Sequence, residues 1–184
     1  ALVGQLTTGA IDRISIHREG AAAELNPKPL TSAVLTGFLR TQTDTVNMVN
    51  APLLARERGM EVREVRTERE GDYHTLLRVS VRTADGERSV AGTLFGDANP
   101  RLVELFGIKV EADLGGPMLY VVNEDAPGFI GRIGTLLGEA GVNIGTFHLG
   151  RRQAGGEAVL LLSVDSEVSA DLLAKVKALP GVKT

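Results

Sequence analysis

The chain has no cysteine in its 184 residues, and this absence excludes disulfide bonds and metal sites built from thiolates. No apolar stretch approaches the roughly 18 consecutive residues that a membrane-spanning helix needs. The first residues also lack the charged and then apolar pattern of a secretory signal peptide. From these absences we expect no membrane partner and a location in the reducing cytoplasm.

Sequence motifs of the common enzyme classes are missing too. The chain has no glycine-rich dinucleotide loop, no phosphate loop with its lysine and no nucleophile elbow. Its three histidines, His17, His74 and His148, are far apart and do not have the spacing of metal ligands. We therefore expect no catalytic residue, no metal and no cofactor in this chain.

The charge balance is mildly acidic, with a formal net charge of −3 at pH 7 and a pI of about 5.7. This balance argues against a nucleic-acid partner. The apolar content of 43% and the charged content of 23% are ordinary for a globular protein with a packed core. A chain of this length forms one large domain or two small ones.

A break in the pattern lies at residues 113–117, where Gly115, Gly116 and Pro117 follow one another. Glycine pairs and proline interrupt regular structure. We therefore predict a first domain over residues 1–114 and a second over residues 115–184.

The second domain reads as strand, helix, strand, strand, helix, strand. An apolar strand over 118–122 precedes a helix over 128–140, and Gly155-Gly156 forms a turn between strands over 142–151 and 158–164. Ser166 is the expected cap of a second helix, and Val182 begins the last strand. This order is the βαββαβ, ferredoxin-like plan.

The first domain has the pattern of an irregular α+β fold with an antiparallel sheet and about two helices. Asn26-Pro27 is expected to open one helix, and Asn50 a second that ends at Gly59. Asp85-Gly86 is a strong two-residue hairpin signal. Residues 101–106 are predicted to form a short helix.

Polar residues flank the predicted helix of the second domain. Asn123 and Asp125 precede it, Gly128 opens it, and Asn143 follows its end. A carboxylate binds an ammonium group, an amide both donates and accepts, and uncapped N–H groups at a helix start attract a carboxylate. The residues therefore suit a small zwitterion. Equally open at this point is that Asp125 only caps the helix and Asn143 only makes a turn.

A second candidate is a basic pair, Arg101 and Lys109, that suits an anion such as a phosphorylated metabolite. Acidic residues are as frequent as basic ones in this part of the chain. A solvated face of mixed charge is therefore the competing interpretation of these two residues.

Several stretches of the chain form recognisable motifs. In the second domain they are VVNEDAPG (121–128), IGTLL (133–137), AGVNI (140–144) and KALPGV (177–182), and in the first they are GAID (9–12), VNMVNAP (46–52), ARERG (55–59) and GTLFG (92–96). With these motifs the second domain resembles an ACT domain, most closely that of D-3-phosphoglycerate dehydrogenases. The first domain resembles the intervening domain of long bacterial forms of that enzyme.

This resemblance implies the C-terminal regulatory part of such an enzyme, which oxidises 3-phosphoglycerate with NAD in serine biosynthesis. It implies L-serine as feedback effector, bound between ACT domains of a homo-oligomer, a dimer or a tetramer. Asp125 and Asn143 match the family's serine-contacting positions, and Asn123 stands where many members have histidine or tyrosine. Without the nucleotide-binding and substrate domains, this chain is expected to have no dehydrogenase activity.

Two other interpretations remain. One is the β chain of an iron–sulfur L-serine dehydratase, which combines similar domains, although the chain has no matching serine-rich segment near its start. The other is an ACT-like module that only assembles an oligomer, by pairing the edge strand near residues 146–149 with its twin.

Overall fold

The computed structural model describes residues 2–7, 9–68, 71–96 and 98–183. The chain divides into two compact units, Ala1–Gly107 and Ile108–Thr184. Within the described residues, no helix combines the length and the apolar character needed to cross a lipid bilayer.

The first unit contains a sheet whose strands are ordered β2-β1-β3-β4-β5. Neighbouring strands are antiparallel except β1 and β2, which are parallel. A parallel pair needs a long crossover, and the helices between these two strands provide it. The strands are β1 (Ile11–Gly20), β2 (Glu61–Thr67), β3 (Thr75–Thr83), β4 (Gly86–Phe95) and β5 (Asn99–Leu105).

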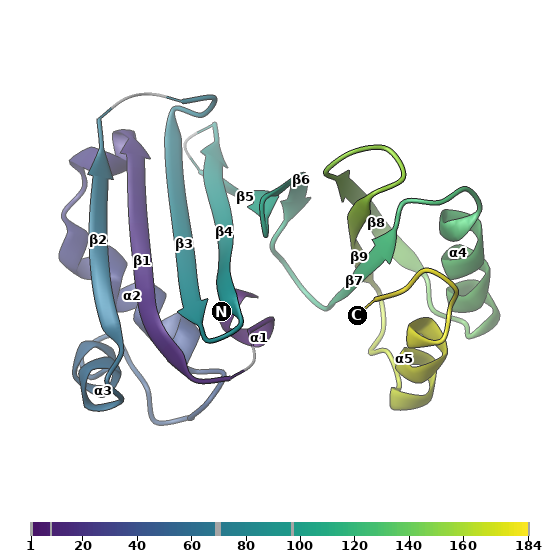
Figure 1. Cartoon of the computed structure of the whole chain (residues 1–184), viewed down its shortest axis with the longest axis horizontal. Helices are drawn as coiled ribbons and strands as arrows, with labels where there is room; N and C mark the ends of the chain where they lie inside the picture. The colour runs from purple at the N-terminus through teal and green to yellow at the C-terminus, as the bar shows by residue number, and fades with distance from the viewer. Residues whose placement is uncertain (1, 8, 69–70, 97, 184) are drawn as a thin grey trace. The chain divides into compact units, whose positions relative to one another are not determined.

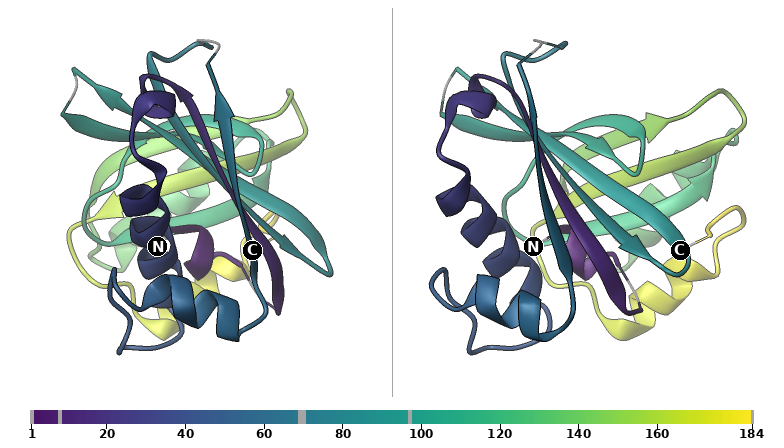
Figure 2. Two further views of the ribbon diagram at one scale, coloured as in Figure 1. Left: turned by 90° about the vertical axis from the view of Figure 1, so that its left-hand side faces the viewer. Right: turned by 60° about the vertical axis from the view of Figure 1, so that its left-hand side comes forward.

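Two main helices cover one face of this sheet, as Figure 2 shows. In α2 (Pro27–Leu39) the side chain of Asn26 accepts a hydrogen bond from the N–H of Lys28, 3.1 Å away, and proline occupies the first turn. The second helix, α3 (Ala51–Glu57), ends just before Gly59, which has a φ of 71°. Both predicted helices are thus confirmed. The short helices are α1 (Leu2–Gln5) and the 3-10 helix η1 (Ala21–Glu24).

The core of the first unit lies between the sheet and these helices. Ile14 and Ile16 on β1 are fully buried, as are Phe38 and Leu39 on α2. The two-residue spacing of the isoleucines directs both toward the same face of the sheet. The alternation of apolar and charged residues in β1 therefore reflects a strand with one face in the core.

The predicted helix over residues 101–106 is wrong, because β5 occupies this stretch and pairs with β4. Leu102 and Leu105 are buried, but a short apolar run does not distinguish a strand from a helix. Phe106 has a φ of 52° and Gly107 a φ of 76°, so a turn ends the strand here.

The second unit contains a three-stranded antiparallel sheet ordered β7-β9-β8. Val182 adds a single antiparallel bridge to Asn123, so the predicted last strand is reduced to one residue pair beside β7. This order confirms the ferredoxin-like plan. Its elements are β7 (Met118–Glu124), α4 (Phe129–Glu139), β8 (Ile144–Arg151), β9 (Glu157–Val164) and α5 (Ala170–Lys177).

Helices α4 and α5 lie on the same face of this sheet (Figure 1). Ile133 and Leu137 of α4 pack in one core with Leu160 and Leu162 of β9. The cap of α5 is Ser169, whose side chain accepts from the N–H of Leu172 at 3.2 Å. The expected cap, Ser166, lies in a bend before it, and both serines suit a cap by residue type alone.

The opposite face of the sheet carries strand β6 (Ile108–Asp113). Gly150 of β8 pairs with Val159, which points away from the face of Leu160 and Leu162. A Cβ at Gly150 would lie 2.4 Å from the carbonyl oxygen of Lys109. Glycine at position 150 thus permits β6 to pack closely against β8. Strand β6 belongs to the second compact unit, whereas the sequence led us to expect the domain boundary after Leu114.

Candidate functional site

Asp125 lies in the turn between β7 and α4 and is tied to the β8–β9 hairpin. Its Oδ2 accepts hydrogen bonds from Arg151 Nη1 at 2.7 Å and from the N–H of Gly155 at 3.1 Å. Its own N–H donates to the carbonyl of Gly156 at 2.8 Å. The Arg151 guanidinium, and then the Gly155 N–H, lower the pKa of Asp125 below its ordinary value, so the carboxylate is charged at neutral pH.

The start of α4 follows directly and lacks a side-chain cap. Gly128 at the N-cap has a φ of 83°, and the first turn contains no acidic residue. Uncapped N–H groups at a helix start carry partial positive charge. Arg132 adds to it, because its Nη1 lies 3.1 Å from the position that a Gly128 Cβ would take. This helix start therefore favours a negatively charged group.

Asn123 is on β7, two residues before Asp125, and is buried. Its Nδ2 donates to the carbonyl of Glu124 at 2.8 Å. Its Oδ1 is buried and has no hydrogen-bond partner among the described residues. A buried acceptor without a donor is costly, so this amide is a polar group in need of a partner.

Asn143 precedes β8 and is held by a residue that follows β9. Its Nδ2 donates to Asp165 Oδ2 at 2.6 Å, and the N–H of Asp165 donates to the Asn143 carbonyl at 3.2 Å. Because an ionised carboxylate only accepts, Asp165 fixes the orientation of the amide. The Oδ1 of Asn143 remains as an acceptor.

Asp125 and Asn143 do not meet within one chain. Glu124 pairs with Glu157 at the beginning of β9, whereas Ile144 pairs with Val164 at its end. An eight-residue strand is about 23 Å long from its first residue to its last at roughly 3.3 Å per residue. The two predicted site residues therefore lie at opposite ends of the sheet.

The basic candidates Arg101 and Lys109 belong to different compact units. Arg101 is half-buried on β5, with its guanidinium 6.0 Å from the centre of the Phe95 ring. Lys109 is exposed on β6. Neither unit by itself unites the two residues, so their role in binding an anion stays a prediction.

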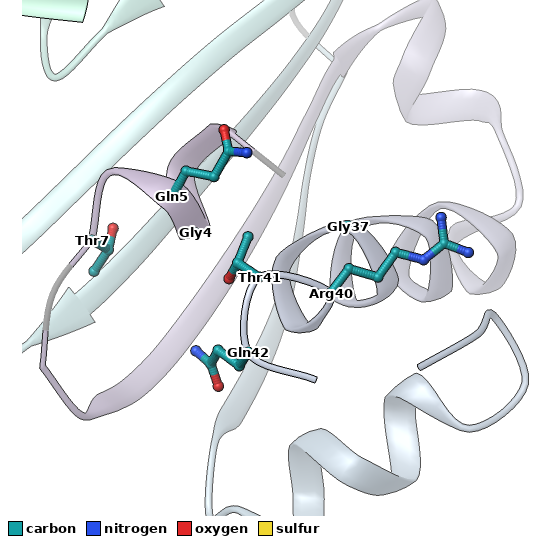
Figure 3. A pocket seen from close by; sticks show the side chains of 7 residues that line it. All are labelled: Gly4, Gln5, Thr7, Gly37, Arg40, Thr41 and Gln42. Atoms are coloured by element: carbon teal, nitrogen blue, oxygen red, sulfur yellow. The ribbon is translucent and has the colours of Figure 1, made fainter. Parts of the chain in front are cut away.

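A hollow of about 570 Å³ lies in the first unit between α1 and the end of α2. Its lining side chains do not converge, since Arg40 extends along α2 away from Gln5 and Thr7 (Figure 3). Among the described residues that line it, Arg40 is the only charged one. Within the described residues, no three histidine or acidic side chains are grouped to hold a metal ion.

Sequence reasoning missed two residues that contact the predicted site, Arg151 and Asp165. For Arg151, the predicted turn at Gly155-Gly156 could have indicated the contact with Asp125. A hairpin closed there places residue 151 beside residue 158, and the next strand in the sheet, β7, ends beside that same hairpin. Asp165 had no comparable signal, because its contact with Asn143 depends on the irregular start of β8.

Comparison with known proteins gives two matches to family models. The D-3-phosphoglycerate dehydrogenase intervening domain matches residues 1–106, and the ACT domain matches residues 118–181. Proteins named D-3-phosphoglycerate dehydrogenase from Synechocystis sp. and Bacillus subtilis are 34% and 32% identical to the chain, each over 99% of it. One from Mycobacterium leprae is 35% identical over 96% of the chain. The chain spans about a third of the length of these relatives.

Proposed function

This chain belongs to the D-3-phosphoglycerate dehydrogenase family, whose intervening and ACT domains it carries, and we propose that it is a regulatory part that binds L-serine as a feedback effector. In this proposal the NAD-dependent oxidation of 3-phosphoglycerate belongs to the rest of a cytoplasmic biosynthetic enzyme, and the chain alone has no dehydrogenase activity. Its role is to bind L-serine, the end product of serine biosynthesis.

The observation that carries the proposal is a charged carboxylate beside an uncapped helix start. Asp125 offers an anionic oxygen to an ammonium group, and the first turn of α4 has no side-chain cap. A zwitterion supplies the opposite charge to each of these two features. The buried Oδ1 of Asn123 is an additional acceptor at the end of the same strand.

Two chains are needed to complete the site, because Asn143 lies at the other end of the sheet. Strand β8 is an edge of the sheet, and edge strands pair readily with another chain. In a twofold antiparallel pair of β8 strands, the end of one strand lies beside the start of the other. Asp125 of one chain then approaches Asn143 of its twin.

The surface around β8 supports such pairing. Phe147 and Leu149 are 37% and 38% exposed, which leaves two large apolar side chains of this edge strand unburied within one chain. Helix α4 contains Gly131, Gly134 and Gly138, and a Cβ at any of them would meet no atom within 4 Å. Each glycine costs the helix about 1 kcal/mol relative to alanine, and close approach of a second chain accounts for their presence.

Regulation follows if L-serine binds one arrangement of the paired chains more tightly than another. Effectors of this kind typically change the affinity or conformational equilibrium of the distant site by about 1–3 kcal/mol. A ligand that contacts both chains binds the paired arrangement more tightly than any other, because the complete site exists only in that arrangement.

Titration calorimetry with L-serine tests the proposal. The wild-type chain should release heat on binding, and Asp125→Ala and Asn143→Ala should each remove that heat. Glu167→Ala is the matched control, since Glu167 is an exposed acid of the same unit and should leave binding unchanged. No heat and no thermal shift for the wild type at millimolar L-serine would refute effector binding.

One observation favours a second candidate, a module that only assembles an oligomer. Asp125 and Asn143 both have partners within the chain, Arg151 and Asp165, so neither side chain needs a ligand. This candidate predicts a dimer that neither binds L-serine nor changes when Asp125 and Asn143 are both replaced by alanine.

A further inference from the structure

The effector proposal leaves one group of the ligand without a side-chain partner, its α-carboxylate. Asn123, whose position matches the family's histidine or tyrosine, is buried and donates its amide N–H to the carbonyl of Glu124. One of the two N–H donors of this amide is therefore already used, and the amide carries no positive charge. A cationic side chain elsewhere in the turn would recognise the carboxylate more strongly than backbone N–H groups alone.

Arg151 has the position and the vacant donors for this role. It is the last residue of β8, and its guanidinium bonds Asp125 through a single nitrogen, Nη1. A guanidinium has five N–H donors in a planar fork. Its Nε and Nη2 bond no other described residue, and the side chain is 55% exposed. The Nε–Nη2 edge is thus open to an incoming carboxylate.

Asp125 has a matching vacancy. Both hydrogen bonds to its carboxylate end on Oδ2, and Oδ1 accepts from no described residue. One charged hydrogen bond, from Arg151 Nη1 to Asp125 Oδ2, therefore joins the two side chains. Oδ1 of Asp125 and the Nε–Nη2 edge of Arg151 are both left for a ligand. An α-amino acid carries an ammonium group and a carboxylate on one carbon atom, so the two charges can bind this pair together.

Resting on the proposed function, we propose that Arg151 binds the α-carboxylate of the effector while Asp125 Oδ1 binds its ammonium group. The ion pair between them is kept, because Nη1 and Oδ2 do not contact the ligand. Arg151 is then a specificity-determining residue that selects zwitterionic amino acids over amines of the same shape. The uncapped start of α4 and the nearby Arg132 reinforce the preference for an anion.

The competing explanation is purely structural, in which Arg151 only holds Asp125 in place. The two roles separate when L-serine is compared with L-serinamide, which retains the ammonium and hydroxyl groups but has no carboxylate. A structural arginine affects both ligands alike, because both use Asp125. A carboxylate-binding arginine affects L-serine alone.

Calorimetric titration of both ligands into the wild type, Arg151→Met and Arg152→Met tests the assignment. The wild type should bind L-serine about 10- to 100-fold more tightly than L-serinamide, the range expected for a charged hydrogen-bonded pair. Arg151→Met should weaken L-serine binding by the same factor and remove the preference. Arg152→Met removes the same charge one residue further along the hairpin and should keep the preference.

Size-exclusion chromatography should show all three proteins in the same oligomeric state. An unchanged preference for L-serine in Arg151→Met, or an equal loss for both ligands, would overturn the role of Arg151 and leave the effector proposal intact. A wild type that binds neither ligand would overturn the effector proposal and this assignment together.

Discussion

Asp125 and Asn143 lie at opposite ends of the sheet formed by β7, β9 and β8, one beside Gly156 and the other beside Asp165. No single chain therefore brings this acid and this amide to the same ligand. The twofold pairing of β8 edges that we propose would bring them together and would create two equal sites per pair. Under this proposal L-serine binding requires dimerisation, and a substitution that prevents pairing of the chains should also prevent binding.

Phe147→Lys should separate the chains and abolish L-serine binding without touching Asp125 or Asn143. Phe147 is 37% exposed on the edge strand, and a lysine on an edge opposes strand pairing. Sedimentation velocity measures the oligomeric state, and calorimetry measures binding. Leu53→Lys is the control, because Leu53 is a 58% exposed residue of α3. A monomeric Phe147→Lys protein that still binds L-serine would show that the site is complete in one chain.

Gly150→Ala should destabilise the second unit by about 1–3 kcal/mol, the usual cost of overpacking a tight contact. The added methyl group would lie 2.4 Å from the Lys109 carbonyl oxygen and 2.8 Å from Ile108 Cγ2, so β6 has to move away. Urea unfolding measures the stability, and hydrogen exchange should locate the loss of protection in β6. Gly115→Ala has open space around it and should change stability little. Equal stability of the two variants would contradict close packing of β6 on β8.

The free energy of unfolding should depend on pH through the ion pair between Asp125 and Arg151. The Arg151 guanidinium, with the Gly155 N–H, holds the pKa of Asp125 below its ordinary value of 3.8. A carboxyl group whose pKa is lowered by folding stabilises the protein above the unfolded pKa, and this contribution is lost as the pH falls through the folded pKa. The wild type should therefore be more stable than Asp125→Asn at pH 6, and this difference should shrink below about pH 4.

Urea unfolding of both proteins from pH 7 to pH 3 measures that difference. High salt should reduce it at neutral pH, because the pair is partly exposed and salt screens such charges. A difference that is constant over the whole pH range would mean that the charge of Asp125 does not contribute to stability.

Local signals in the sequence predicted much of the fold. Asn26-Pro27 located the start of α2, Asp85-Gly86 located the β3–β4 hairpin, and the helical pattern over residues 128–140 located α4. These features depend on neighbouring residues, which the sequence shows directly. The strand at β5 was missed because its conformation depends on pairing with β4, and the short apolar run alone fits a helix equally well.

For the candidate site, the sequence suggested residues but not their geometry, and the roles of these residues stay predictions. Asp125 and Asn143 were chosen from their residue types at the ends of a predicted helix and from the resemblance. Their separation along β9 follows from strand register, which no local pattern gives. Their partners Arg151 and Asp165 come from elements distant in sequence for the same reason. A polar residue whose role depends on long-range pairing is therefore found only when the sheet is known.

Mixing two inactive variants tests the shared site most directly. Asp125→Ala and Asn143→Ala chains that carry different tags are exchanged into mixed dimers, and the mixed dimers are purified by means of both tags. Each mixed dimer should contain one native site, formed by the intact Asn143 of one chain and the intact Asp125 of the other. Calorimetry should show no binding to either variant alone and binding of L-serine to the mixed dimer with wild-type affinity at half the wild-type number of sites. A mixed dimer that binds L-serine no better than either variant alone would contradict a site shared between two chains.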